Sequence, residues 1–364
     1  WWGWAVSLSA LVVALSAPLL GAIADRSGLR KRFMAIYVAF CLAGVALLAT
    51  VGPGMVVAGF ALFVVANIGF EGAVVFYNAY LSDITPPEER GSVSSYGFGW
   101  GYLGSALGLV LALVFLQVLF PGQIEAVWLL VAGFFFVFAI PAFRYLPSDR
   151  AGDMRAGEAA VWGLRRFHVT LREVWRLRDL RRFLLSYFFY IDGILTVIVM
   201  AGVIATGTFG FEQTDTIILF LVVQFSALAG AFVLAKPTDR LGPKGVLTGV
   251  LIMWVIAGIA AYFVQTTPVF YGLAIVAGLG LGSVQSASRA YMSLLIPEGR
   301  EAEMFGFYAF CGKTSSVLGP LLFGLATFLA AGNQRPGFLV LTALMLIGLL
   351  LLQRVADPLA KARS

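Results

Sequence analysis

The sequence predicts an all-α integral membrane protein, and three observations support this class. Hydrophobic residues make up 60% of the 364 residues and charged residues only 12%, whereas soluble domains carry about 25% charged residues. Apolar stretches of the length that crosses a bilayer as a helix recur along the chain. Lys and Arg gather in alternate connections between these stretches, as expected of a protein with several membrane spans.

Eleven apolar stretches are long enough to cross the bilayer, and several are long enough to cross it with tilt. In chain order they cover residues 1–24, 33–52, 55–82, 93–120, 124–146, 183–206, 215–236, 245–265, 268–292, 304–331 and 337–354.

The basic residues predict the orientation of these spans. Of the 25 Lys and Arg residues, 22 lie in the odd-numbered connections and the C-terminal tail, and one, Arg335, lies in the even-numbered connections. Because basic connections stay in the cytoplasm, we expect this basic side and the C-terminus to be cytoplasmic. The abundance of Arg, Ala, Gly and Leu favours a bacterial plasma membrane.

Two short patterns each occur twice on the basic side. Asp25–Arg30 (DRSGLR) is similar to Asp239–Lys244 (DRLGPK), and Pro87–Arg90 (PEER) is similar to Pro297–Arg300 (PEGR). Since both copies lie on the same side, the sequence predicts two bundles related by a pseudo-two-fold axis along the membrane normal.

This repeat predicts the domain organisation. We expect an N-terminal helical bundle over 1–146, a basic linker over 147–182 and a C-terminal helical bundle over 183–364. The second bundle has six spans and the first has five, so we expect one further span before Trp1. The eleven visible spans are then spans two to twelve.

The linker contains an amphipathic segment. Leu164, Phe167, Leu171 and Trp175 keep helical spacing, with arginines elsewhere on the helix. Two interpretations fit this pattern equally: a helix lying on the inner membrane surface, and a solvated linker helix.

The loop from Gly21 to Arg32 (GAIADRSGLRKR) resembles the signature loop of the major facilitator superfamily, and Gly230–Lys244 resembles its second copy. The chain further resembles the vacuole-effluxer-like family, which includes the autophagy-related vacuolar amino-acid exporter of yeasts. The stretches that carry this resemblance are Asn67–Ala73, Phe76–Ala79, Tyr190–Gly193, Val284–Arg289, Leu295–Glu303, Phe305–Tyr308 and Leu318–Gly324. The resemblance implies a major-facilitator-type fold and a secondary transporter of amino acids that works by alternating access.

Four ionisable residues lie inside spans, where charge is costly and therefore indicates function. They are Glu71, Asp192, Arg289 and Lys313. Two acids and two bases suit a zwitterion, with Lys313 or Arg289 meeting its carboxylate and Glu71 or Asp192 its ammonium group. Two alternatives stay open: salt bridges between helices, and a role for Glu71 or Asp192 as a proton carrier.

Uncharged polar residues within spans are further candidates for substrate binding or coupling. They are Asn67, Asn78, Tyr190 and Gln285. The alternative is that they hold helices together, which is the commoner role of Asn and Gln in membranes. Gln285 stands out because it lies one turn from Arg289 on the same helix face.

The repeated loop patterns supply candidate gating residues. They are Asp25, Arg26, Gly28, Arg30, Glu88, Arg90, Asp239 and Arg240. Asp25 can face an arginine or a helix N-terminus across the basic side. The resemblance implies that this clamp stabilises the outward-open state.

Other classes of function find less support. The sequence has no GxSxG, HExxH or P-loop motif, so an enzyme is not expected. We expect neither cofactor, metal nor nucleic acid, and name the lipid bilayer, a small-molecule substrate and protons as partners. The alternatives to amino-acid transport are export of another small organic solute and a non-transporting scaffold or sensor of the same fold.

Overall fold

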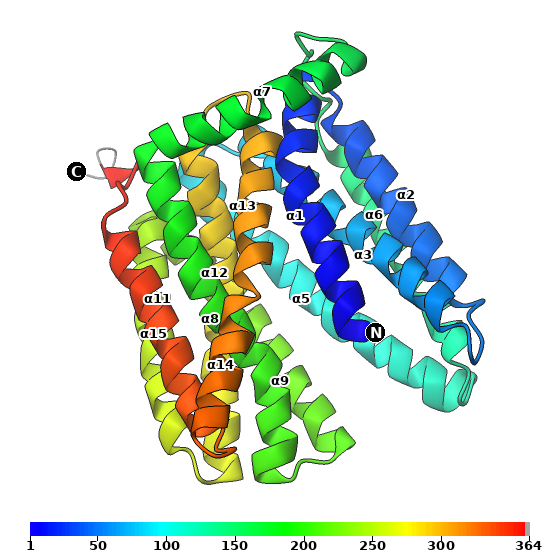
Figure 1. Ribbon diagram of the computed structural model, residues 1–364, viewed down its shortest axis with the longest axis vertical. Helices are drawn as coiled ribbons and strands as arrows, with labels where there is room; N and C mark the ends of the chain where they lie inside the picture. Colours follow the sequence, from blue (N-terminus) through cyan, green and yellow to red (C-terminus); the bar gives the residue numbers. More distant parts are fainter. Residues whose placement is uncertain (361–364) are drawn as a thin grey trace. The chain divides into compact units, whose positions relative to one another are not determined.

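The computed structural model describes residues 1–360, and the long elements among them are helices (Figure 1). Within the described residues, eleven helical stretches are long and apolar enough to span a membrane, which confirms the predicted number of spans. Residues 361–364 of the basic tail lie outside the described part. The helices are α1 (Trp2–Ser27), α2 (Arg30–Leu48), α3 (Val56–Ala79), α4 (Leu81–Ile84), α5 (Arg90–Val114), α6 (Ile124–Tyr145), α7 (Ala156–Arg176), α8 (Arg178–Phe209), α9 (Gln213–Val233), α10 (Ala235–Leu241), α11 (Pro243–Phe263), α12 (Thr267–Leu295), α13 (Glu301–Ser315), α14 (Leu318–Leu329) and α15 (Arg335–Gln353).

Local sequence sets where several helices begin and end. α1 ends at Gly28, whose φ of 63° lies in the left-handed region that glycine adopts readily. α11 begins with Pro243, because proline has no N–H to leave unsatisfied in a first turn. A one-turn helix, Pro87–Glu89, leads into α5, and α5 continues as a π-helical turn over Phe115–Leu119.

One compact unit contains Trp1–Ile84, Leu107–Arg172 and Ile296–Phe310. Within it α2 packs against α3, with α1 on α3 and α6 on α2 (Figure 1). Gly69 allows the close approach of α3 to α2, since a Cβ there would lie 2.6 Å from the carbonyl oxygen of Tyr37. We call this part unit 1.

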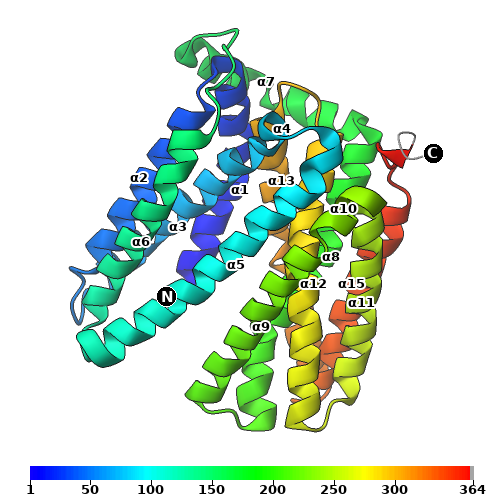
Figure 2. The same ribbon diagram turned by 180° about the vertical axis from the view of Figure 1, so that it is seen from behind.

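Unit 2 contains Thr85–Ala106, Glu173–Leu295 and the described chain from Cys311 on. In it α9 packs against α12 and α8 against α15, and α11 contacts both α12 and α15 (Figure 2). Glycine again permits the closest helix contact: a Cβ on Gly278 of α12 would lie 2.7 Å from the carbonyl oxygen of Val223 on α9.

The two units divide the chain differently from the two sequence halves. The start of α5 belongs to unit 2 and the start of α13 to unit 1. Helices α5 and α13 therefore each contribute to both units. The predicted domains 1–146, 147–182 and 183–364 stay a prediction.

The tenth visible span is interrupted, whereas the sequence predicted one continuous stretch over 304–331. α13 ends at Ser315 and α14 begins at Leu318. Pro320 explains the break, because proline has no N–H to donate to the carbonyl four residues earlier and its ring crowds that carbonyl. The span is thus two half-helices joined in its middle.

Candidate functional site

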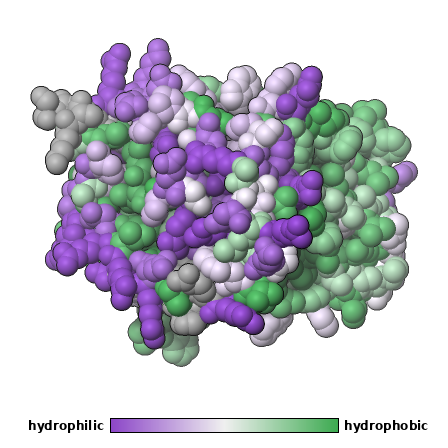
Figure 3. Space-filling view, turned by 90° about the horizontal axis from the view of Figure 1, so that it is seen from above, coloured by the Kyte–Doolittle hydropathy of each residue, from purple (hydrophilic) through white to green (hydrophobic). Residues whose placement is uncertain are grey.

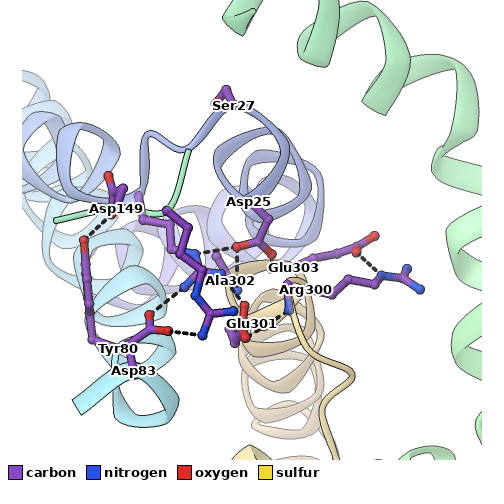
Figure 4. A network of polar contacts seen from close by, with 12 residues as sticks. Asp25, Ser27, Tyr80, Asp83, Asp149, Arg300, Glu301, Ala302 and Glu303 are labelled. Atoms are coloured by element: carbon purple, nitrogen blue, oxygen red, sulfur yellow. Dashed lines mark hydrogen bonds and ion pairs between the residues drawn. The ribbon is translucent and has the colours of Figure 1, made fainter. Parts of the chain in front are cut away.

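A cluster of charged side chains lies in unit 1, and Figure 4 labels its carboxylates Asp25, Asp83 and Glu301. The Arg30 guanidinium donates to Asp25 Oδ1 at 2.6 Å, to Asp83 Oδ2 at 2.8 Å and to Glu301 Oε2. The side chains of Arg30, Asp25 and Glu301 are 7%, 2% and 3% exposed. One buried guanidinium therefore faces three carboxylates, which are too many for it to neutralise.

The backbone of α13 balances part of this excess negative charge. Asp25 accepts hydrogen bonds from the backbone N–H groups of Ala302 at 3.2 Å and Glu303 at 2.9 Å. The first N–H groups of a helix have no partner within it, and a helix N-terminus carries about half a positive charge. Asp25 thus caps α13 from the end of α1.

Small residues bring α1 and α13 close enough for this cap. A Cβ on Gly21 would lie 2.7 Å from the backbone N of Glu303 and would overlap the Ala302 carbonyl. A Cβ on Gly306 would lie 2.6 Å from the Ala17 carbonyl oxygen. Two glycines on facing helices therefore set the distance at which Asp25 reaches the α13 backbone.

The start of the linker, residues 146–155, is tied to the same cluster. Asp149 accepts hydrogen bonds from the Tyr80 hydroxyl at 2.5 Å and from the backbone N–H of Lys31 at 2.8 Å, so it caps α2. Arg150 pairs with Asp83 at 3.1 Å and with Glu298 at 3.2 Å. The linker therefore supplies a second cation to the cluster.

Gly28 has a second role beside its left-handed turn. A Cβ there would lie 2.7 Å from the backbone N of Gly152, so the signature loop and the linker touch backbone to backbone. Arg26 reinforces this contact by pairing with Asp153 at 2.6 Å and lying 4.9 Å from the centroid of the Trp162 ring.

Unit 2 contains the corresponding cap from the second copy of the loop. Asp239 Oδ1 accepts a 2.8 Å hydrogen bond from the backbone N–H of Ser92, in the first turn of α5. A Cβ on Gly91 would lie 2.6 Å from that oxygen. Arg90 donates to the Ser293 carbonyl at 2.8 Å.

In each cap, an aspartate from one half of the sequence binds the start of a helix from the other half. The aspartate of the first-half loop caps the helix that follows Pro297–Arg300, and the aspartate of the second-half loop caps the helix that follows Pro87–Glu89. Each repeated pattern is thus half of a contact with the other half of the chain. Glu88 and Arg240, two predicted gating residues, are exposed.

Arg289 joins α12 to the start of α5 within unit 2. It donates to the Ser94 hydroxyl at 2.9 Å and the Ser94 carbonyl at 2.8 Å, and lies 4.7 Å from the Phe98 ring centroid. One turn away, Gln285 accepts a 2.8 Å hydrogen bond from the Tyr102 hydroxyl. In this conformation both predicted site residues make helix–helix contacts.

Asp192 and Tyr190 lie in the core of unit 2. Asp192 is 0% exposed, and its Oδ1 is 3.4 Å from the Thr196 hydroxyl while Oδ2 has no hydrogen-bond partner among the described atoms. A Cβ on Gly319 would lie 2.7 Å from Oδ1, so the carboxylate faces the first turn of α14, beside the break in its span. Tyr190 shares a 2.7 Å hydrogen bond with Ser288.

Three charged side chains lie at the middle of their spans. Glu71, Asp192 and Lys313 are each within two residues of the midpoint of the helical stretch that carries them, whereas Arg289 lies near the basic end of its span. Glu71 and Lys313 are partly exposed. Such mid-span charges occupy the depth at which transporters bind their substrates.

Two predicted asparagines share α3 with Glu71. Asn67, one turn before Glu71, donates to the Ser9 hydroxyl of α1 at 2.6 Å. Asn78 lies near the basic end of α3 and is partly buried. Both asparagines belong to unit 1, as Glu71 does.

Sequence reasoning missed several residues that the structure adds to these clusters. They are Tyr80, Asp83, Ser94, Asp149, Arg150 and Glu301. Glu301 could have been found from the sequence, because it lies in Leu295–Glu303, a stretch that carries the family resemblance. Asp149 and Ser94 offered none, because their partners are far away in the sequence. Among the described residues, no three His, Cys, Asp or Glu side chains are arranged so that they could hold a metal ion.

Comparisons with known proteins show what the chain is similar to. The family model described as "Vacuole effluxer Atg22 like" matches residues 4–363. The uncharacterised MFS-type transporter YxiO of Bacillus subtilis is 30% identical over 363 residues, which cover 98% of this chain and 84% of that protein. Autophagy-related protein 22-1 of Aspergillus niger is 27% identical over 283 residues, 71% of this chain and 46% of the fungal protein.

The fold is shared with a solved transporter. The crystal structure of the human organic anion transporter MFSD10 superposes with a TM-score of 0.80 at 20% identity, covering 96% of this chain and 83% of that one. At this identity the likeness shows the fold alone.

Proposed function

Because the chain belongs to the vacuole effluxer Atg22-like family of major facilitator transporters, we propose that it carries amino acids across the membrane by alternating access. Transport of the major facilitator type follows from the family. Our proposal concerns the identity of the substrate and the coupling of its transport to protons.

The observation that carries the amino-acid assignment is the set of charges within the spans. Glu71, Asp192 and Lys313 lie at mid-span, so side chains of both signs occur at the depth at which transporters bind their substrates. A zwitterion offers one carboxylate and one ammonium group, and charge-assisted hydrogen bonds to both would offset the cost of dehydrating them.

The contacts of Arg289 suggest its role. Arg289 donates to Ser94 and lies over Phe98 in this conformation, so we assign it to holding α5 against α12. Lys313 is then our choice for the substrate carboxylate. Further candidates for substrate binding or coupling are Glu71, Asn67, Asn78, Tyr190 and Gln285. These positions are proposals for mutagenesis.

The caps made by Asp25 and Asp239, which we call the crossed caps, could open and close the pathway on the basic side. Asp25 holds the start of α13, and Asp239 holds the start of α5. Alternating access requires such contacts to form in one state and break in the other. We therefore assign Asp25, Arg26, Gly28, Arg30, Glu88, Arg90, Asp239 and Arg240 to the gate, with Asp83, Asp149, Arg150 and Glu301 added from the structure.

Asp192 is our candidate for proton coupling. Its side chain is fully buried and Oδ2 has no donor among the described atoms. A carboxyl group can bind and release a proton, and Asp192 lies at mid-span, where a coupling proton would have to pass. Proton release would accompany a conformation that admits water to the break between α13 and α14.

Flux measurements in proteoliposomes test the proposal. The purified chain should exchange internal unlabelled amino acids for external radiolabelled ones, and Lys313→Ala should abolish this exchange. Lys236→Ala, which removes an exposed basic residue instead, is the matched control and should exchange normally. Exchange of organic anions without exchange of any amino acid would reject the substrate and favour another small organic solute.

A further inference from the structure

The linker helix α7 presents three distinct faces. At about 100° per residue, Ala159, Gly163 and Val174 fall on one face, and all three are buried. At Gly163 this face meets α1, since a Cβ there would lie 3.1 Å from Leu19 Cδ1. This face anchors the helix to the protein.

An exposed apolar stripe lies on the other side of α7. Val161, Leu164 and Trp175 fall within about 60° of one another on the helix, and they are 49%, 66% and 57% exposed. Phe167 and Leu171, which the sequence pattern places near this stripe, are outside the side chains that the structure describes. A solvated linker helix has no reason to expose three large apolar side chains on one face.

Arginines border the stripe along one edge. Arg165, Arg172 and Arg176 occupy the next sector of the helix, within about 60° of the stripe, and all three are exposed. Arg181 extends the border, with its guanidinium 5.6 Å from the centroid of the Trp175 ring. Hydrophilic and hydrophobic residues lie side by side on this surface of the molecule (Figure 3).

A groove adjoins the same edge. Its volume is about 710 Å³, and Val161, Trp162 and Arg165 are among its lining residues. Glu158 also lines it, but its carboxylate accepts a hydrogen bond from the backbone N–H of Arg155 at 3.2 Å. The groove thus combines an apolar wall with a guanidinium. The wall could contact the glycerol backbone of a phospholipid, and the guanidinium could contact its phosphate.

We propose that α7 binds the bilayer surface through its exposed stripe and selects anionic phospholipids through Arg165, Arg172 and Arg176. An amphipathic helix of this kind lies in the interface, with its apolar side chains at the boundary of the acyl chains and its cations among the headgroups. Because one face is held on α1, lipid binding at the other face connects the composition of the membrane to the linker and through it to the cluster around Arg30.

The test follows a fluorescent label on the stripe of the full chain, in a background with Cys41 and Cys311 replaced by Ala. A label on Leu164→Cys should be quenched by lipids that carry a spin label just below the headgroup. Quenching should increase when phosphatidylcholine vesicles are changed to an equal mixture with phosphatidylglycerol. A label on Lys236→Cys, at an exposed position outside α7, should respond instead to aqueous iodide.

A triple variant isolates the role of the arginines. Replacing Arg165, Arg172 and Arg176 by Gln should remove the increase with phosphatidylglycerol, since each arginine near an anionic surface contributes about fivefold to surface partitioning. Replacing the exposed Arg32, Lys236 and Arg354 by Gln is the control of equal charge and should keep the increase.

Two results would overturn the proposal. Quenching of the Leu164 label by iodide and not by spin-labelled lipid would reject membrane contact. Lipid quenching that is equal with and without phosphatidylglycerol would reject the selection of anionic lipids. Neither result depends on transport, so the proposed substrate is tested separately.

Discussion

The carboxylate of Asp25 accepts a 2.9 Å hydrogen bond from the backbone N–H of Glu303, 278 residues later in the chain. Asp239 makes the equivalent bond to the backbone of Ser92. Both aspartates come from copies of one loop pattern, and both helices that they cap follow copies of a second pattern. The internal repeat of the sequence is therefore also a pair of contacts between its halves.

Loss of the Asp25 charge should destabilise this contact. In Asp25→Asn an amide replaces a carboxylate that is 2% exposed and that accepts two backbone N–H groups of α13. Arg30 keeps its pairs with Asp83 and Glu301, so the expected loss is that of a helix cap, about 0.5–2 kcal/mol. Thermal unfolding in detergent should show a clear drop in melting temperature.

Asp153→Asn is the matched control for Asp25→Asn. It breaks the pair with Arg26, whose side chains are 41% and 53% exposed, and exposed pairs contribute about 0–1 kcal/mol. An equal drop in melting temperature in the two variants would show that the buried position of Asp25 adds nothing to the stability of the protein.

Gly21→Ala should separate α1 from α13. The new Cβ would overlap the Ala302 carbonyl, so α1 must shift and the Asp25 cap must lengthen. Gly101→Ala provides the comparison, because its Cβ would meet nothing within 4 Å. A cysteine introduced at buried Ala24 should react faster with a water-soluble maleimide in Gly21→Ala, and at an unchanged rate in Gly101→Ala. Equal labelling in both variants contradicts the close contact.

The sequence predicted the spans, their alternating connections and the repeat, because apolar length, basic residues and turn residues are local signals. It also identified Asp25, Arg30 and Asp239 through their spacing. It could not show that Asp83 and Glu301 converge on Arg30, since that requires the approach of α4 and α13. Arg289 shows the same limit: its contacts with Ser94 and Phe98 depend on how α5 lies against α12. The break in the tenth span had a visible cause in Pro320, and the length of the apolar stretch concealed it.

Two neighbouring linker residues should differ in their effect on stability. Asp149 is a cap that accepts two hydrogen bonds, from Tyr80 and Lys31, so Asp149→Ala should cost about 0.5–2 kcal/mol. Arg150 is 54% exposed, and Arg150→Ala should cost less than about 1 kcal/mol. Unfolding followed by tryptophan fluorescence compares them, and a larger loss for Arg150→Ala would reject the cap.

Substitutions of Arg289 and Lys313 should have different effects on the KM of transport. Arg289→Lys keeps the charge but loses the paired bonds to Ser94, so it should lower stability and leave the KM for amino acids nearly unchanged. Lys313→Gln should raise KM about tenfold or more, since a hydrogen bond to a charged group contributes about 1.5–3 kcal/mol. The reverse pattern would assign the substrate carboxylate to Arg289.

Asp192→Asn should uncouple transport from protons. The amide cannot release a proton, so uptake driven by a pH gradient should stop while exchange of internal for external amino acid continues. Thr196→Ala, which removes only the neighbouring hydroxyl, should keep the response to the gradient. A full response in Asp192→Asn would exclude Asp192 as the proton carrier.

The accessibility of a cysteine at position 24 in the Asp25→Asn, Asp239→Asn double variant tests the proposed gate most directly. Ala24 is 0% exposed, beside the Asp25 cap. The gate predicts that loss of both caps raises the rate of maleimide labelling from the basic side and lowers amino-acid exchange in the same protein. Unchanged labelling together with unchanged exchange would contradict the assignment of the crossed caps as the gate.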